Sequence, residues 1–69
     1  MNLRDLRKQN KKTQAELGQE LGITGQAIAN YENGTRTPSI LFALKYAKAL
    51  GVSIDIFAKC YEKDDYLSG

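Results

Sequence analysis

The sequence predicts an all-α domain of five short helices, and three kinds of observation support this expectation. Apolar residues recur at intervals of three and four positions, which is the spacing of one helix face, and no stretch alternates convincingly as a strand would. Residues that commonly cap helices precede these stretches, and glycines follow several of them. The 69 residues, of which 42% are apolar and 26% charged, suffice for one globular domain, 1–69, but not for a second core.

The first third of the chain is expected to hold two helices. Leu3 and Leu6 share one face of a first helix over roughly residues 2–10. The second helix begins after Thr13, because Thr13 and Glu16 have the spacing of a capping box. Its buried stripe and its end are expected at Leu17, Leu21 and Gly22.

A third helix follows after a very short link, so the two helices must cross steeply. Thr24 is a good N-cap for it, with Ile23 and Ile28 at the positions of a hydrophobic staple. A glycine inside a helix costs about 0.8–1 kcal/mol relative to alanine, so a packing reason for Gly18 is expected at the crossing. The inward face of the third helix is expected to consist of Ala27, Ile28 and Tyr31.

Two more helices complete the domain. A turn that contains Pro38 leads to a fourth helix, capped by Ser39 or Thr37. Gly51 ends this helix, and Ser53 caps the fifth. The core stripe of the fourth helix is expected at Ile40, Ala43, Leu44, Ala47 and Leu50.

The outward face of the third helix carries amides instead of charges. Gln26, Ala29, Asn30 and Asn33 share it at spacings of three and four. Gln and Asn side chains pair with adenine N6 and N7, and a small Ala allows close approach or contacts a thymine methyl group. The pattern favours a helix that lies in the major groove of DNA, although an ordinary exposed face of unusual composition would also give it.

Charge is distributed unevenly along the chain. Residues 1–12 carry a net charge of +4, and residues 61–69 a net charge of −2. The basic end is therefore expected to face a polyanion, unless it is simply a solvated basic helix. Phosphate contacts are expected from Gln14 at the start of the second helix, where backbone N–H groups favour an anion, and from Asn33, Thr35 and Arg36.

Five fragments carry a resemblance to a known family: Thr13-Gln14-x-Glu16-Leu17, Leu21-Gly22-Ile23-Thr24, Ile28-x-x-Tyr31-Glu32-Asn33-Gly34, Arg36-x-Pro38-Ser39 and Ala47-x-Ala49-Leu50-Gly51-Val52-Ser53. In this order and spacing, over residues 2 to about 58, they resemble the Xre/Cro family, the helix-turn-helix domains of phage repressors and related bacterial regulators. The resemblance implies a compact five-helix phage-repressor-like domain, with the helix-turn-helix motif at about 13–33 and residues 24–33 as the recognition helix. It implies a phosphate contact from Gln14, and base contacts from Gln26, Ala27 and Asn30. Thr24, the N-cap of the third helix, is also expected to contact a phosphate.

One position departs from the family pattern. Gly25 is the first residue of the expected recognition helix, where many members of the family carry a longer polar side chain. The departure removes one potential base contact. The bases are therefore expected to be read from one turn of helix instead of two.

A homodimer is expected, because a lone domain would read only half of an operator, whose half-sites lie about 34–36 Å apart. The fifth helix is apolar on two sides, so it can bury one side in its own core and the other against a copy. Leu41 and Phe42 add apolar residues that are expected to be exposed. Full burial, or scattered surface apolar residues, would explain the same pattern. The dimer interface is expected at Ile56, Cys60 and Tyr61.

The sequence argues against an enzyme, a metal site and a cofactor. It contains no His and one cysteine, Cys60, so it offers neither the ligands of a zinc site nor a base beside a nucleophile. No apolar stretch approaches the about 20 residues of a membrane span, and no signal-peptide pattern opens the chain. A cytoplasmic, nucleoid-associated protein is expected.

We therefore expect a sequence-specific transcriptional regulator of double-stranded DNA, a repressor that occupies a palindromic operator as a dimer. The alternative is an antitoxin or another module whose main partner is a protein, such as a toxin or an anti-repressor. The fifth helix and the acidic stretch Tyr61–Leu67, which overlaps a short C-terminal tail at about 62–69, would bind that partner. Binding a toxin alone would not require the amides of the third helix, Arg36 or a basic first helix.

Overall fold

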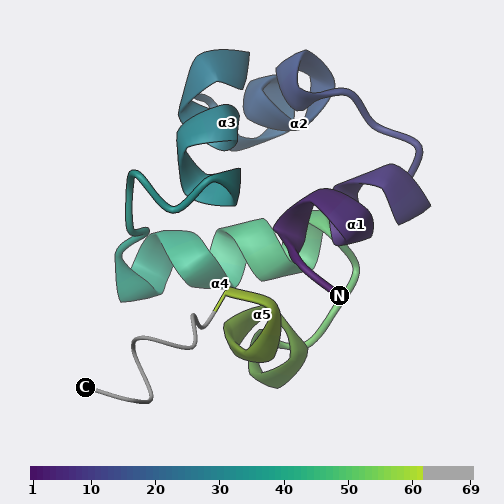
Figure 1. Cartoon of the computed structure of the whole chain (residues 1–69), viewed down its shortest axis with the longest axis vertical. Coiled ribbons are helices and arrows are strands. Elements are labelled where there is room, and N and C mark those ends of the chain that lie inside the picture. The colour runs from purple at the N-terminus through teal and green to yellow at the C-terminus, as the bar shows by residue number, and fades with distance from the viewer. Residues whose placement is uncertain (62–69) are drawn as a thin grey trace.

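A computed structural model describes residues 1–61, which form five helices and no strand (Figure 1). The all-α, five-helix fold class is thereby confirmed, and the tail expected at about 62–69 lies outside the described residues. The helices α2 and α3 lie together at one end of the molecule, with α4 below them and α5 packed against α4 (Figure 1). The helices are α1 (Leu3–Gln9), α2 (Gln14–Leu21), α3 (Gly25–Glu32), α4 (Ile40–Ala49) and α5 (Ile54–Tyr61).

The start of α2 has the expected capping box. The backbone N–H of Thr13 donates to the Glu16 carboxylate at 2.8 Å, and the Thr13 hydroxyl accepts the N–H of Glu16 at 3.0 Å. These two hydrogen bonds, with the backbone one the larger cause, lower the pKa of Glu16 below its usual value. The helix α1 begins with the same arrangement, between Asn2 and Asp5.

A close contact between α2 and the turn after it explains Gly18. A Cβ atom at this position would lie 2.7 Å from the carbonyl oxygen of Ile23 and 2.9 Å from the carbonyl atoms of Thr24. Gly22 ends α2 in the left-handed conformation, with a φ of 74°. The Thr24 hydroxyl then accepts the N–H of Ala27 at 3.1 Å and begins α3. The expected caps and tight turn are therefore confirmed.

Four aromatic rings, contributed by α3, α4 and α5, form the centre of the core. Tyr46 has its ring centroid 5.7 Å from that of Tyr31, 6.0 Å from that of Phe42 and 5.0 Å from that of Phe57. These are distances at which aromatic pairs attract one another. The aliphatic side chains buried around them are Leu3, Leu6, Leu17, Ile28, Ala47 and Leu50.

The inward face of α4 differs from the expected one. Tyr46 is fully buried and Phe42 packs against the core, although Phe42 was expected on the surface. Ile40 and Leu44, expected in the core stripe, are 81% and 47% exposed, and Leu41 is exposed as expected. Tyr46 and Phe42 therefore fill the space in the core that was predicted to hold Ile40 and Leu44. The rest of the expected stripe does contact the core: Ala43, Ala47 and Leu50.

The last helix also packs differently from the expectation. Phe57 is buried, and Cys60 is partly buried against the core, so these two residues share the inward side of α5. Ile54 and Ile56 are 38% and 47% exposed. Of the three residues expected in a dimer interface, Ile56 is therefore accessible and Cys60 largely faces the protein's own core. The side chain of Tyr61 lies outside the described part.

Candidate nucleic-acid interface

The outward side of α3, called the amide face below, consists of Gln26, Ala29, Asn30 and Asn33. Gln26 and Asn33 are exposed, and Ala29 and Asn30 are half-buried. The Nε2 atom of Gln26 donates to Oδ1 of Asn30 at 3.3 Å, so the two amides contact each other one turn apart. Each amide nitrogen carries two hydrogens, so both residues retain N–H groups that can donate to a base.

Two residues expected at the DNA have structural roles in α3. Ala27, for which the resemblance implied a base contact, is only 8% exposed, in agreement with its expected place on the inward face. Its neighbour Ala29 on the amide face is more accessible. Thr24 is exposed, and its hydroxyl oxygen caps the helix by accepting the N–H of Ala27. Its O–H remains able to donate to a phosphate.

Gly25 lies where the first turns of α2 and α3 approach each other. A Cβ atom at Gly25 would lie 3.1 Å from the backbone nitrogen of Ala15 and 3.3 Å from the carbonyl carbon of Gln14. A side chain here would require one of the two helix starts to move. Gly25 therefore brings Gln14, the first residue of α2, close to the start of α3.

The loop after α3 holds three further residues that were expected to contact phosphates. The Oδ1 atom of Asn33 accepts hydrogen bonds from the backbone N–H and the hydroxyl of Thr35. The guanidinium of Arg36 lies 5.9 Å from the centroid of the Tyr31 ring, within cation–π distance. All three side chains are exposed at the end of the amide face. Their positions fit phosphate contacts.

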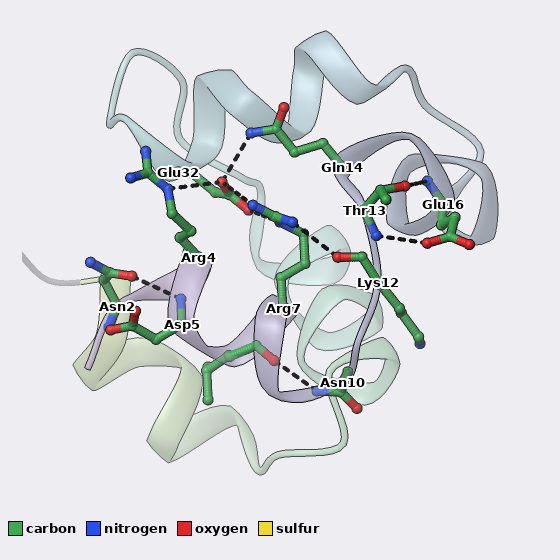
Figure 2. Close-up of polar contacts among 11 residues, drawn as sticks. Asn2, Arg4, Asp5, Arg7, Asn10, Lys12, Thr13, Gln14, Glu16 and Glu32 are labelled. Carbon is green, nitrogen blue, oxygen red and sulfur yellow. Dashed lines mark hydrogen bonds and ion pairs between the residues drawn. The ribbon is translucent and has the colours of Figure 1, made fainter.

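A buried carboxylate lies beside the amide face (Figure 2). The Glu32 side chain is only 1% exposed. Its carboxylate accepts hydrogen bonds from Nε of Arg7 at 2.6 Å and from Nη2 of Arg7 at 3.3 Å. The Nε2 atom of Gln14 donates to Glu32 Oε1 at 3.1 Å, and Nε of Arg4 lies 3.8 Å from the same oxygen. Arg7 also donates to the carbonyl oxygen of Lys12 at 2.9 Å. Gln14 is thus held by α3 as well as by its own helix.

Sequence reasoning missed this cluster, although two signals pointed to it. Arg7 follows Leu3 by four positions, so it shares the buried face of α1. A buried charge requires a partner, and Glu32 is the acidic residue of α3. Arg7 and Lys12 belong to the basic residues 1–12, which were expected to face a polyanion or to be simply solvated. Arg7 instead joins α1 to α3, and Lys12 Nζ contacts Glu20 and the carbonyl oxygen of Ala49.

Two other features, a cluster of metal ligands and a membrane-spanning helix, are absent from the part of the chain that the structure describes. Among residues 1–61, no three His, Cys, Asp or Glu side chains are grouped as a metal ion would require. No helix in the same range has the length and apolar character needed to cross a membrane.

Comparisons with known proteins agree with the fold. A helix-turn-helix family model matches residues 3–57. The chain is 40% identical over 58 residues to YqaE, an uncharacterized HTH-type transcriptional regulator of Bacillus subtilis. The aligned region covers 84% of this chain but only 50% of YqaE. The chain is 38% identical over 56 residues to YgzD of the same organism, covering 80% of this chain and 85% of YgzD. It is 44% identical over 54 residues to MJ0272 of Methanocaldococcus jannaschii, covering 77% and 79% of the two chains. The chain therefore belongs to the helix-turn-helix family of the Xre/Cro type.

Proposed function

We propose that this protein is a transcriptional regulator that binds double-stranded DNA in a sequence-specific manner and represses by occupying its operator. The observation that carries the proposal is the amide face of α3, which is exposed, uncharged and held by a tight crossing with α2. The names of the relatives, which are HTH-type transcriptional regulators, support it. The proposed base-contacting residues are Gln26, Asn30 and, in place of Ala27, the more accessible Ala29.

Contacts to the DNA backbone would position α3. The proposed residues come from both ends of the helix-turn-helix unit: Gln14 and Thr24 at the helix starts, and Asn33, Thr35 and Arg36 after α3. Such contacts supply affinity and salt dependence without sequence preference. The proposed setting is the cytoplasm, on the nucleoid.

The exposed apolar residues support a homodimer on a palindromic operator. Five large apolar side chains of α4 and α5 are between 38% and 81% exposed. Large exposed apolar patches mark protein interfaces, and Ile40 and Leu44 lie one turn apart on the same side of α4. We therefore extend the proposed dimer interface from Ile56 to all five of these residues: Ile40, Leu41, Leu44, Ile54 and Ile56. Cys60, which packs against the core, would contribute less contact area to this interface.

Binding measurements on single variants test direct base readout. Asn30→Ala and Gln26→Ala should each cost about 1–3 kcal/mol on the preferred duplex and relax the preference at particular base pairs. Arg36→Ala should weaken binding to all duplexes alike and flatten the salt dependence. Gln19→Ala, which removes an exposed amide from α2, is the matched control and should change neither quantity. Equal losses on preferred and random duplexes from the two α3 variants would contradict direct readout.

The second candidate is a module whose main partner is a protein, such as a toxin or an anti-repressor. The exposed Ile40 and Leu41 favour it, because they would serve a foreign partner as well as a second copy. The two functions separate in one experiment. A purified protein that remains monomeric and binds no duplex from a random pool, yet is stabilised by a co-expressed protein, would favour the second candidate.

A further inference from the structure

Two arginines, Arg4 and Arg7, lie near the Glu32 carboxylate, although one is enough to neutralise its charge. Arg7 meets both of its oxygens, through Nε at 2.6 Å and Nη2 at 3.3 Å, so these two residues form a neutral pair. Arg4 lies 3.8 Å from Oε1, beyond ordinary hydrogen-bond distance, and its side chain is 56% exposed. Arg4 is therefore a surplus cation at the mouth of a buried, already neutralised site.

Gln14 shares the same carboxylate oxygen with Arg4. Its Nε2 atom donates one N–H to Glu32 Oε1 at 3.1 Å. The nitrogen carries a second hydrogen, which is left to donate elsewhere. In Figure 2 the nitrogen end of the Gln14 amide is turned toward Glu32 and the side of Arg4, and the oxygen end points away. Glu32 thus fixes the orientation in which the amide presents its donor end beside the guanidinium.

We propose that Arg4 and Gln14 together bind one backbone phosphate of the DNA, and that the buried Glu32–Arg7 pair positions them. The inference rests on the proposed function, because the phosphate belongs to the duplex that α3 reads. A phosphate oxygen suits both an amide N–H and the fork of a guanidinium. Ala29 lies one turn before Glu32 on the same side of α3, so the phosphate lies at the edge of the amide face.

The arrangement also explains why a carboxylate can lie so near a phosphate. Arg7 keeps Glu32 neutralised and is itself buried, so it stays in place. The exposed Arg4 keeps Nε on the side of Glu32, 3.8 Å from Oε1, and uses its terminal guanidinium nitrogens for the phosphate. Glu32 and Arg7 are accordingly positioning residues, and Arg4 and Gln14 make the contact.

The test compares Arg4→Gln with Lys8→Gln. Both remove one positive charge from an exposed position of α1, one turn apart. The dissociation constant is measured at several salt concentrations on a duplex selected from a random pool and on a random-sequence duplex. Arg4→Gln should weaken binding about tenfold on both duplexes and lower the salt slope by about one. Lys8→Gln should weaken it by about twofold, as expected for a screened charge without a contact.

A double-variant cycle tests whether one phosphate is shared. If Arg4 and Gln14 hold the same phosphate, the combined variant Arg4→Gln/Gln14→Ala should lose less affinity than the product of the two single losses. Thermal unfolding of each variant establishes that the fold is retained. Equal losses from Arg4→Gln and Lys8→Gln, with wild-type binding intact, would overturn the inference and leave the proposed function standing. A wild-type protein that binds no duplex would overturn both.

Discussion

At the residue scale, Gly18 sets how closely α2 approaches the turn before α3. Its neighbours are backbone atoms, which cannot move aside without opening the crossing. For Gly18→Ala we expect a net loss of about 1–2 kcal/mol, because overpacking against backbone atoms costs about 2–3 kcal/mol, the upper part of the usual range, and the gain in helix propensity returns about 1 kcal/mol. Denaturant unfolding measures it. Gln19→Ala, one position on and exposed, is the control, and a Gly18→Ala protein as stable as wild type would contradict the contact.

The capping box of α2 makes stability depend on pH. The pKa of Glu16 is lowered by the hydrogen bond from the Thr13 backbone N–H, then by that from the Thr13 hydroxyl. A lowered pKa means that the contribution to stability is present above the usual carboxyl pKa and is lost as the pH falls through the folded-state value. Glu16→Gln should therefore have a lower melting temperature than wild type at pH 7, and the difference should shrink in acid. A difference that grows below pH 4 would refute this sign.

Local signals in the sequence were sufficient for the caps but not for the polar cluster. Thr13, Gly22 and Thr24 act through neighbours within three or four positions, so their roles follow from spacing alone. The pairing of Arg7 with Glu32 spans 25 positions and depends on how α1 meets α3. Such a contact can be suspected from a charge on a buried face, but its partner is fixed only by the tertiary structure.

At the scale of the elements, the rotation of α4 shows where a hydrophobic stripe misleads. Two overlapping stripes are available on this helix, one aliphatic through Ile40 and Leu44, and one aromatic through Phe42 and Tyr46. The aromatic one is buried, because its rings pack against Tyr31 across the core. The periodicity located the helix correctly, but the choice between the stripes depends on the shape of the space that α3 and α5 leave.

The link between α1 and α3 predicts a large effect from a single substitution. Arg7→Met would leave the Glu32 carboxylate buried without the cation that is hydrogen-bonded to it, which typically costs about 3–5 kcal/mol. The control is Arg4→Met, which removes the surplus, half-exposed arginine and should change stability by no more than about 0.5 kcal/mol. The free energy of unfolding in denaturant checks both. Similar losses from the two variants would mean that the carboxylate does not depend on Arg7.

At the scale of the whole molecule, the proposed dimer rests on the apolar residues left outside the core. Five such side chains on a domain this small predict a dimer in sedimentation at micromolar concentration. Leu41→Glu should shift the protein to the monomer and weaken binding to a palindromic duplex. Gln19→Glu introduces the same charge on α2 and should leave the dimer intact. A wild-type protein that sediments as a monomer, both free and on DNA, would rule out this assembly.

The molecule as a whole combines an uncharged amide face with two groups of phosphate-binding candidates. The first group is Arg4 and Gln14, which both approach the Glu32 carboxylate. The second group is Thr35 and Arg36, in the loop after α3. The sequence alone indicated the amides and the loop, while the first group required the structure, because Gln14 reaches across to a helix that begins eleven positions later.

Selection of bound duplexes from a random DNA pool tests sequence-specific binding without any assumption about the operator. A dimer that reads DNA through α3 should enrich inverted repeats whose half-site centres lie about 34–36 Å apart, one turn of DNA. An Asn30→Ala protein should enrich the same repeats with relaxed preference at particular positions. A wild-type protein that enriches no sequence over the starting pool would contradict sequence-specific binding.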